Sequence, residues 1–210
     1  MTLRLLTFGN ARSGPARLTT ERLLLRRPEG RDFEAWADLR AVSRAQLEPF
    51  EPSWTRDELS RGAFRARLRA HEADVNAGRG LPWFVFHRDG RKEGRLMGGL
   101  ALSNIRRGVC QTATLGYWLG TPFTGHGFMR EAVRTVVESG FAEHRLNRIE
   151  AGTVPENERS QRLLTACGFQ REGTARGYLR IAGAWRDHVI FARLGTDACL
   201  AVSEHADAAE

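Results

Sequence analysis

The stretch from Leu115 to Phe141, LGYWLGTPFTGHGFMREAVRTVVESGF, decides the expected fold. It begins with an apolar segment that predicts a short strand, and it breaks at Gly120-Thr121-Pro122. The chain then turns through residues 124–127 and enters a predicted helix. Apolar and small residues recur in that helix at one-turn spacing, which predicts one buried face: Ala132, Val133, Val136, Val137, Gly140 and Phe141.

A strand, a glycine turn and a helix in this order predict an anion site. The first N–H groups of a helix have no partner within it, and the helix dipole places partial positive charge there. Gly125 and Gly127 have no Cβ, so each can take a positive φ and let a phosphate approach the main chain. No Lys-Ser or Lys-Thr follows these glycines, and no third glycine completes a dinucleotide fingerprint. The pattern therefore predicts a pyrophosphate site on a different fold.

Length and composition predict one compact domain. The chain has 210 residues, 41% of them hydrophobic and 27% charged, as in ordinary globular proteins. No run has the length of a membrane span, and the N-terminus lacks a signal-peptide pattern, so we expect a cytoplasmic protein. We expect a loose arm over residues 1–16, the domain over 17–195, and a disordered tail over 196–210.

Cysteines and charge exclude some classes of protein. Cys110, Cys167 and Cys199 are odd in number and lack metal-ligand spacing, so we expect no disulfide framework and no metal site. The formal charge is +7, almost all from arginine, since Lys92 is the only lysine. This balance favours anionic partners such as CoA phosphates, RNA or an acidic peptide. Without a compact basic run with interleaved aromatic residues, we expect a solvated arginine surface and no direct binding of nucleic acid.

The N-terminal half predicts one strand and two helices. Residues 18–26 predict the opening strand, and Asp32 is the expected N-cap of the first helix. Thr55 and Glu58 have the spacing of a capping box for the second helix, which we expect to end at Gly78 or Gly80.

The rest of the chain predicts strands around two further helices. Strands are expected over the ranges 83–86, 96–105, 111–119, 148–154, 173–181 and 185–194, and a helix over 155–167. The expected fold is a mixed α/β (α+β) fold, with a mostly antiparallel central sheet of about seven strands and about four helices.

The motif around the glycine loop resembles the acetyl-CoA pyrophosphate loop of the GNAT superfamily of N-acetyltransferases. The resemblance rests on Tyr117-Trp-Leu-Gly120 and on Gly125-His-Gly-Phe-Met-Arg-Glu-Ala132, and the order of elements over residues 18–194 agrees with it. In that family the loop reads Gln/Arg-x-x-Gly-x-Gly/Ala, whereas Pro122 stands here at its first position. The resemblance implies acetyl-CoA as cofactor, held by Trp118, Leu119, Thr124, Gly125, His126, Gly127, Phe128, Met129, Asn157 and Ser160.

Within the superfamily the chain is similar to the RimJ/RimL-type ribosomal-protein alanine N-acetyltransferases. Four stretches carry this similarity: residues 18–23, 47–54, 103–108 and 178–188. It implies transfer of an acetyl group from acetyl-CoA to the N-terminal α-amine of a protein that begins with Ala or Ser, such as a ribosomal protein.

Acetyl transfer to an amine requires deprotonation of the ammonium, donors for the carbonyl oxygen, and a proton for the leaving thiolate. An α-amine has a pKa of roughly 7.7–8.0, so a carboxylate acting through water suffices as base. Glu150, between apolar residues of its strand, is the best candidate, with Asp187 and His188 as rivals. The alternative for Glu150 is a solvent-facing side chain paired with an arginine. Asn157 is the expected N-cap of the helix that follows it. By resemblance, Ser160 protonates the thiolate and Asn157 also contacts the cofactor. A backbone N–H near Leu119 is the expected oxyanion donor.

The acceptor is expected to lie between the loop over residues 49–54 and the segment over residues 178–188, against Phe50, Trp54 and Tyr178. One alternative keeps the fold and the cofactor but acetylates a small amine such as an antibiotic or a polyamine. Another is a non-catalytic acyl-CoA-binding module. We expect no membrane partner, and a monomer or a homodimer.

Overall fold

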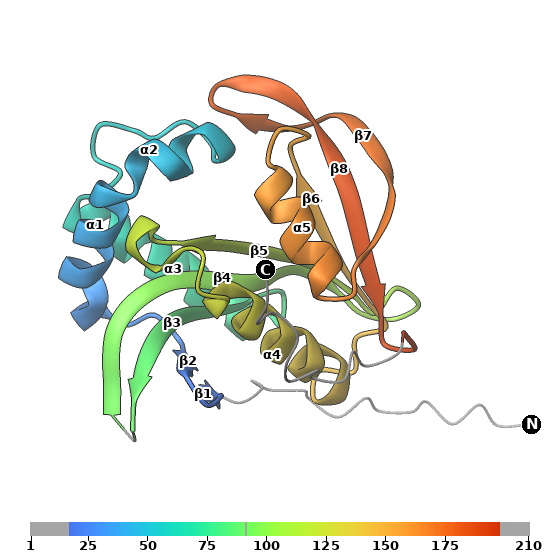
Figure 1. Cartoon of the computed structure of the whole chain (residues 1–210), viewed down its shortest axis with the longest axis horizontal. Helices are drawn as coiled ribbons and strands as arrows, with labels where there is room; N and C mark the ends of the chain where they lie inside the picture. The colour runs from blue at the N-terminus through green and yellow to red at the C-terminus, as the bar shows by residue number, and fades with distance from the viewer. Residues whose placement is uncertain (1–16, 91, 198–210) are drawn as a thin grey trace, which may run out of the picture.

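The structure, a computed structural model, describes residues 17–90 and 92–197. The expected N-terminal arm and most of the expected tail lie outside these ranges. The described chain forms one domain of strands and helices (Figure 1). The strands are β1 Arg17–Thr19, β2 Leu23–Arg26, β3 Leu81–Asp89, β4 Lys92–Arg106, β5 Thr112–Leu119, β6 Arg148–Thr153, β7 Gln170–Ile181 and β8 Ala184–Leu194. The helices are α1 Phe33–Val42, α2 Arg44–Leu47 and α3 Arg61–Asn76 between β2 and β3, α4 Phe128–Ala142 between β5 and β6, and α5 Glu158–Ala166 between β6 and β7. Short 3-10 turns, η1 Gly30–Asp32, η2 Glu48–Phe50 and η3 Thr121–Phe123, complete the domain. In the described ranges no helix is both long and apolar enough to cross a membrane.

All strands form one eight-stranded sheet in the order β1-β2-β3-β4-β5-β6-β8-β7. Every neighbouring pair is antiparallel except β5 and β6. The expected class of fold is confirmed, with one more strand and one more short helix than expected. The additional strand arises because residues 20–22 break the predicted first strand into β1 and β2.

Two apolar cores cover the two faces of the sheet. On one face, α4 and α5 pack over the strands (Figure 1) through residues such as Val133, Val136 and Leu164. On the other face, Trp36 of α1 and Phe64 of α3 pack against aromatic residues of β3. Cys167 lies in the first core, where burial raises the pKa of its thiol to about 11.

The beginnings of the first two long helices differ from the prediction. Asp32 does precede α1, but its carboxylate makes no capping bond to the helix. The predicted capping box at Thr55 and Glu58 is wrong, because α3 starts only at Arg61. Ser60 is the actual N-cap, and its hydroxyl accepts a hydrogen bond from the Ala63 amide. Asp57 instead accepts a hydrogen bond from Thr55.

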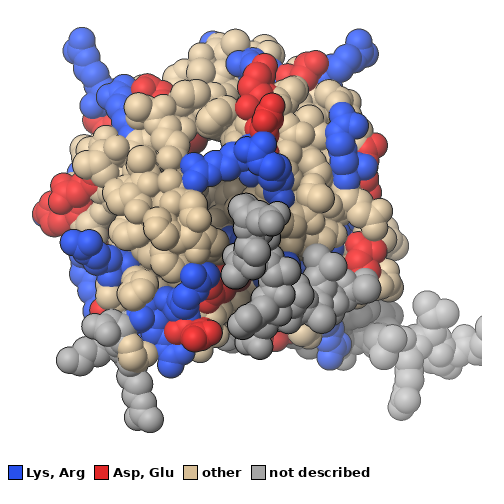
Figure 2. All heavy atoms as spheres, in the orientation of Figure 1, with Lys and Arg blue, Asp and Glu red and all other residues tan. Residues whose placement is uncertain are grey.

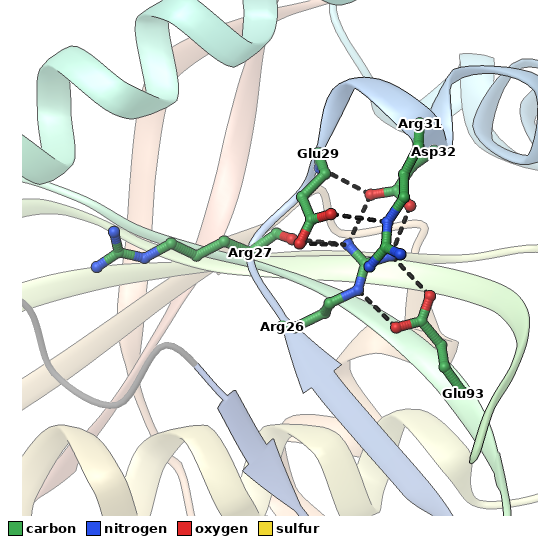
Figure 3. Close-up of polar contacts among 6 residues, drawn as sticks. All are labelled: Arg26, Arg27, Glu29, Arg31, Asp32 and Glu93. Atoms are coloured by element: carbon green, nitrogen blue, oxygen red, sulfur yellow. Dashed lines mark hydrogen bonds and ion pairs between the residues drawn. The ribbon is translucent and has the colours of Figure 1, made fainter.

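The Asp32 carboxylate is used in a buried ion-pair cluster (Figure 3). The Arg26 guanidinium donates to both oxygens of Asp32, at 2.7 and 2.6 Å, and to both oxygens of Glu93, at 2.7 Å each. Asp32 also accepts from the Glu29 amide at 2.7 Å. Hydrogen bonds from Arg26 hold the pKa of Glu93 below its usual value. The cluster therefore fixes β2 to β4 and to the start of α1.

Candidate active site

The candidate site lies where the neighbouring strands β5 and β6 separate. The parallel strands β5 and β6 pair only from Thr112 opposite Arg148 to Thr114 opposite Glu150. Beyond that point the two strands diverge, and the edge of β5 that ends at Leu119 has no strand beside it on this side. A cavity of about 940 Å³ occupies the opening. It is lined by the diverging strands, the glycine loop, α2 and the N-terminal part of α5.

The glycine loop forms one end of this cavity. Gly125 and Gly127 have φ values of +86° and +75°, which side chains with a Cβ rarely adopt. Gly127 is the N-cap residue of α4 and provides no side-chain cap. A Cβ on Gly125 would meet no atom within 4 Å, so the space above this residue is open. The amides of both glycines donate to no acceptor within the described part of the chain. The loop therefore fits an anionic group such as a pyrophosphate.

Arginines surround the same cavity. Arg130 of α4 and Arg159 and Arg162 of α5 belong to its lining. Figure 2 shows a hollow in this face of the molecule, with basic side chains extending across its mouth. The expected surplus of positive charge thus stands in part where a phosphorylated cofactor would bind.

A pair of hydroxyl groups lies deeper in the cavity. The Tyr117 hydroxyl of β5 lies 2.6 Å from Ser160 Oγ of α5. Burial raises the pKa of Tyr117, against the opposing effect of its hydrogen bond with Ser160, so the phenol stays protonated. Ser160 is held in place by the start of its helix, because the Asn157 side chain accepts a hydrogen bond from the Ser160 amide at 3.1 Å. The predicted N-cap at Asn157 is confirmed.

The opposite wall is formed by η2 and the turns after it. The buried Arg40 donates to both oxygens of Glu51, and the Trp54 indole N–H donates to Glu51 at 2.8 Å. Arg40 also lies 4.4 Å from the centre of the Trp54 ring. The tip of the β7–β8 hairpin is joined to this loop, because the Ala182 amide donates to the Glu51 carbonyl at 2.9 Å. The hairpin tip thus holds the backbone of Glu51, which lines the cavity.

The structure places most of the predicted site residues in the lining of this cavity. The lining includes Phe50, Trp118, Leu119, Thr124, Gly125, Gly127, Phe128, Met129, Asn157 and Ser160. The lining does not include His126, Glu150, Trp54 or Tyr178.

Each of these last residues has another partner. His126 stacks on Phe128, with ring centres 5.8 Å apart. Glu150 accepts a hydrogen bond from Arg148 at 2.8 Å, which is the alternative that the sequence left open. Trp54 supports Glu51, and Tyr178 packs edge-on against His188 with ring centres 5.5 Å apart. Trp54 and Tyr178 thus lie behind the residues that line the cavity.

Sequence reasoning missed several residues of the lining. Tyr117 was part of the quoted motif but was assigned only to a strand, and its hydroxyl pairs with a residue 43 positions away. Glu51, Arg130, Arg159 and Arg162 were also not predicted. Arg159 and Arg162 come directly after the Asn157 cap, which places them in the first turns of α5 and beside the cavity.

Comparison with known proteins agrees with this geometry. The acetyltransferase (GNAT) domain family matches residues 22–170. The [ribosomal protein uS5]-alanine N-acetyltransferase of Escherichia coli is 35% identical over 186 residues, which cover 88% of this chain and 94% of that protein. The structure of Mycobacterium smegmatis RimJ in complex with CoA-disulfide superposes with a TM-score of 0.75 at 31% identity, covering 82% of this chain and 81% of that one. The probable N-acetyltransferase YjcK of Bacillus subtilis is 48% identical over 103 residues, and this match spans only 57% of its length.

The chain therefore belongs to the GNAT acetyltransferase family and is an acetyl-CoA-dependent N-acetyltransferase. Within this family its relatives include the RimJ/RimL-type ribosomal-protein N-acetyltransferases, so the resemblance inferred from the motifs is confirmed.

Proposed function

We propose that this enzyme acetylates the N-terminal α-amine of a protein that begins with Ala or Ser, and that this protein is a ribosomal protein. The observation that carries the proposal is the cavity between β5 and β6. The glycine loop forms one end of it. Phe50 and Glu51, which form the proposed acceptor wall, stand at the other end, where the β7–β8 hairpin contacts Glu51. The 35% sequence identity with the Escherichia coli ribosomal-protein enzyme, over 94% of that protein, supports this choice of acceptor. Such an acceptor places the enzyme in the cytoplasm.

The cofactor-binding residues have separate tasks. The backbone at Gly125 and Gly127 holds the pyrophosphate, and Arg130, Arg159 and Arg162 neutralise its charge and that of the remaining phosphate. The unpaired edge of β5 lies beside the acyl group, where a backbone N–H near Leu119 donates to the carbonyl oxygen as negative charge develops. Acetyl-CoA supplies an activated thioester.

Ser160 protonates the leaving sulfur in this proposal. Both hydroxyls carry a proton, and in this proposal the Tyr117 hydroxyl donates to Ser160 Oγ, which leaves the serine proton directed at the sulfur. When the C–S bond breaks, its electron pair stays on sulfur and takes the Ser160 proton. Tyr117 then returns a proton to Ser160 and recovers one from the acetylated amine or from water.

The acceptor wall favours an extended chain end with a small first residue. Phe50 lines the cavity, and Trp54 and Tyr178 support the residues that face it. Glu51 lines the same wall, but Arg40 holds it in an ion pair, with an N–O distance of 2.5 Å. This wall therefore lacks the group of unpaired carboxylates that would favour a polyamine.

The test is a rate comparison among acceptors. Peptides beginning with Ala or Ser, the same peptides beginning with Phe, blocked peptides with an internal lysine, spermidine and an aminoglycoside are each incubated with acetyl-CoA. Thiol release gives the rate, and mass spectrometry locates the acetyl group. We expect α-amine acetylation of the Ala and Ser peptides with the highest kcat/KM. Faster turnover of spermidine or of the aminoglycoside would show a small-molecule acetyltransferase, and binding of acetyl-CoA without turnover of any amine would show a non-catalytic module.

A further inference from the structure

The cavity contains one nitrogen base that the mechanism above does not use. His188 of β8 lines the cavity and is only 3% exposed. Its Nδ1 lies 3.1 Å from the Arg186 carbonyl oxygen. A carbonyl oxygen only accepts, so the proton must be on Nδ1 and the lone pair on Nε2. Within the described residues Nε2 has no hydrogen-bond partner.

The carboxylates on the same wall are less suitable as bases. Glu51 is paired with Arg40, Glu156 with Arg186 at 2.7 Å, and Glu158 with Arg162 at 3.0 Å. An amine would have to displace the arginine N–H groups from these oxygens before it could reach them. The carboxylate that the sequence favoured, Glu150, is also paired, with Arg148, and does not line the cavity.

The surroundings of His188 hold its ring in place beside the opening of the sheet. The Tyr178 ring of β7 packs edge-on against it. On β6, a Cβ added to Gly152 would lie 3.6 Å from the His188 ring, so the absence of a side chain there makes room for it. The neighbouring Asp187 accepts from the Gly177 amide, and Arg186 is paired with Glu156. The cavity side of the ring thus lies beside Gly152, and the charged side chains of Arg186 and Asp187 are bound to other partners.

We propose that His188 is the general base of the reaction. Nε2 accepts a proton from the acceptor ammonium, which leaves a neutral amine with a free electron pair. That pair forms the N–C bond to the acyl carbon while the C–S bond breaks and Ser160 protonates the sulfur. The nitrogen then gives up its second proton to the Tyr117–Ser160 pair, which restores the Ser160 proton and leaves a neutral amide. His188 then releases its proton to solvent. This assignment rests on the proposed acetylation of an amine, but it does not depend on which amine is the acceptor.

The test compares the wild type with His188→Gln over pH 6–9, using any amine that the wild type acetylates. An α-amine is largely neutral above a pH of roughly 8, so a base is needed mainly below it. We expect the variant to lose on the order of 10²-fold in kcat near the acidic end, as for the loss of one acid–base group, and much less near the alkaline end. The Kd for acetyl-CoA should stay the same. A defect of equal size at every pH, or none, would overturn the proposal.

Further measurements separate catalysis from structure. His188→Ala should recover activity with added imidazole, in proportion to the free-base form, whereas a purely structural histidine should show no such dependence. His144→Gln is the matched control, because His144 is also buried but lies outside the cavity. If the His188 variants do not fold, ¹⁵N-histidine NMR of the wild type still tests the tautomer, and a proton on Nε2 at neutral pH would refute the assignment. A wild type that acetylates no amine would instead refute the proposed function.

Discussion

The Tyr117 hydroxyl on β5 and the Ser160 hydroxyl on α5 lie 2.6 Å apart across the opening of the sheet. If Ser160 protonates the leaving thiolate, Ser160→Ala should lower kcat by roughly 10²-fold or more, as for one acid–base participant. The dissociation constant of acetyl-CoA should change little, because the group acts in the transition state. Steady-state kinetics and calorimetric titration measure the two constants.

Tyr117→Phe tests the other half of this pair. The variant removes only the hydroxyl and keeps the buried ring, so the fold should persist. We expect a smaller loss of kcat than for Ser160→Ala, and the double variant should be no slower than Ser160→Ala alone. Additive losses would show that the two hydroxyls act independently.

The glycine loop gives a prediction about binding rather than turnover. Gly127→Val places a β-branched side chain at a φ of +75° beside the Arg22 guanidinium, where the phosphate should approach. Acetyl-CoA binding should be lost, and calorimetric titration checks this. Gly108→Val is the matched control, since Gly108 has a φ of +69° but stands in the turn between β4 and β5, away from the cavity lining. Its affinity should match that of the wild type, and equal losses in both variants would point to strain alone.

Phe50 gives the prediction for the acceptor. It lines the cavity and is 39% exposed, so its ring is available to a peptide. Phe50→Ala should raise the peptide KM by roughly fivefold or more, because truncating a contacting aromatic side chain costs about 1 kcal/mol or more. The KM for acetyl-CoA should be unchanged. Val42→Ala, which removes an exposed side chain outside the lining, should leave both constants as they are.

Local patterns predicted the parts of the site that are local. The glycine loop and the Asn157 cap depend on a few adjacent residues, and both are found where expected. The prediction failed where a side chain has a distant partner. Asp32 has the sequence context of a cap but binds Arg26 instead. The hydroxyl pair joins β5 to α5 across 43 positions of the sequence, and no periodicity in the sequence reports it.

The Arg26 cluster gives a prediction about stability. Asp32→Asn leaves the buried guanidinium short of negative charge, and breaking a buried pair typically costs about 3–5 kcal/mol. We expect a loss of this order in the free energy of unfolding, measured with urea at neutral pH. The triple variant Arg26→Met/Asp32→Leu/Glu93→Gln should recover part of the loss, since it leaves none of these three charges unpaired. Arg44→Ala is the control, because its pair with Glu48 is exposed to solvent and its loss should leave the free energy of unfolding nearly unchanged.

The buried His144 and the half-buried His71 predict how the free energy of unfolding depends on pH. Burial lowers the pKa of His144 and of His71 below the usual 6.5. In each case a nearby arginine lowers the pKa further, and a nearby carboxylate partly opposes the shift. Between the folded and unfolded pKa values the unfolded chain therefore binds more protons, and stability falls as the pH falls from about 6.5. Glu93, with a lowered pKa, adds a further loss only below about 4.5. Urea unfolding at pH 7.5 and 5.5 should show lower stability at the acidic value, and His144→Gln should reduce that difference. A wild type equally stable at both values would contradict the prediction.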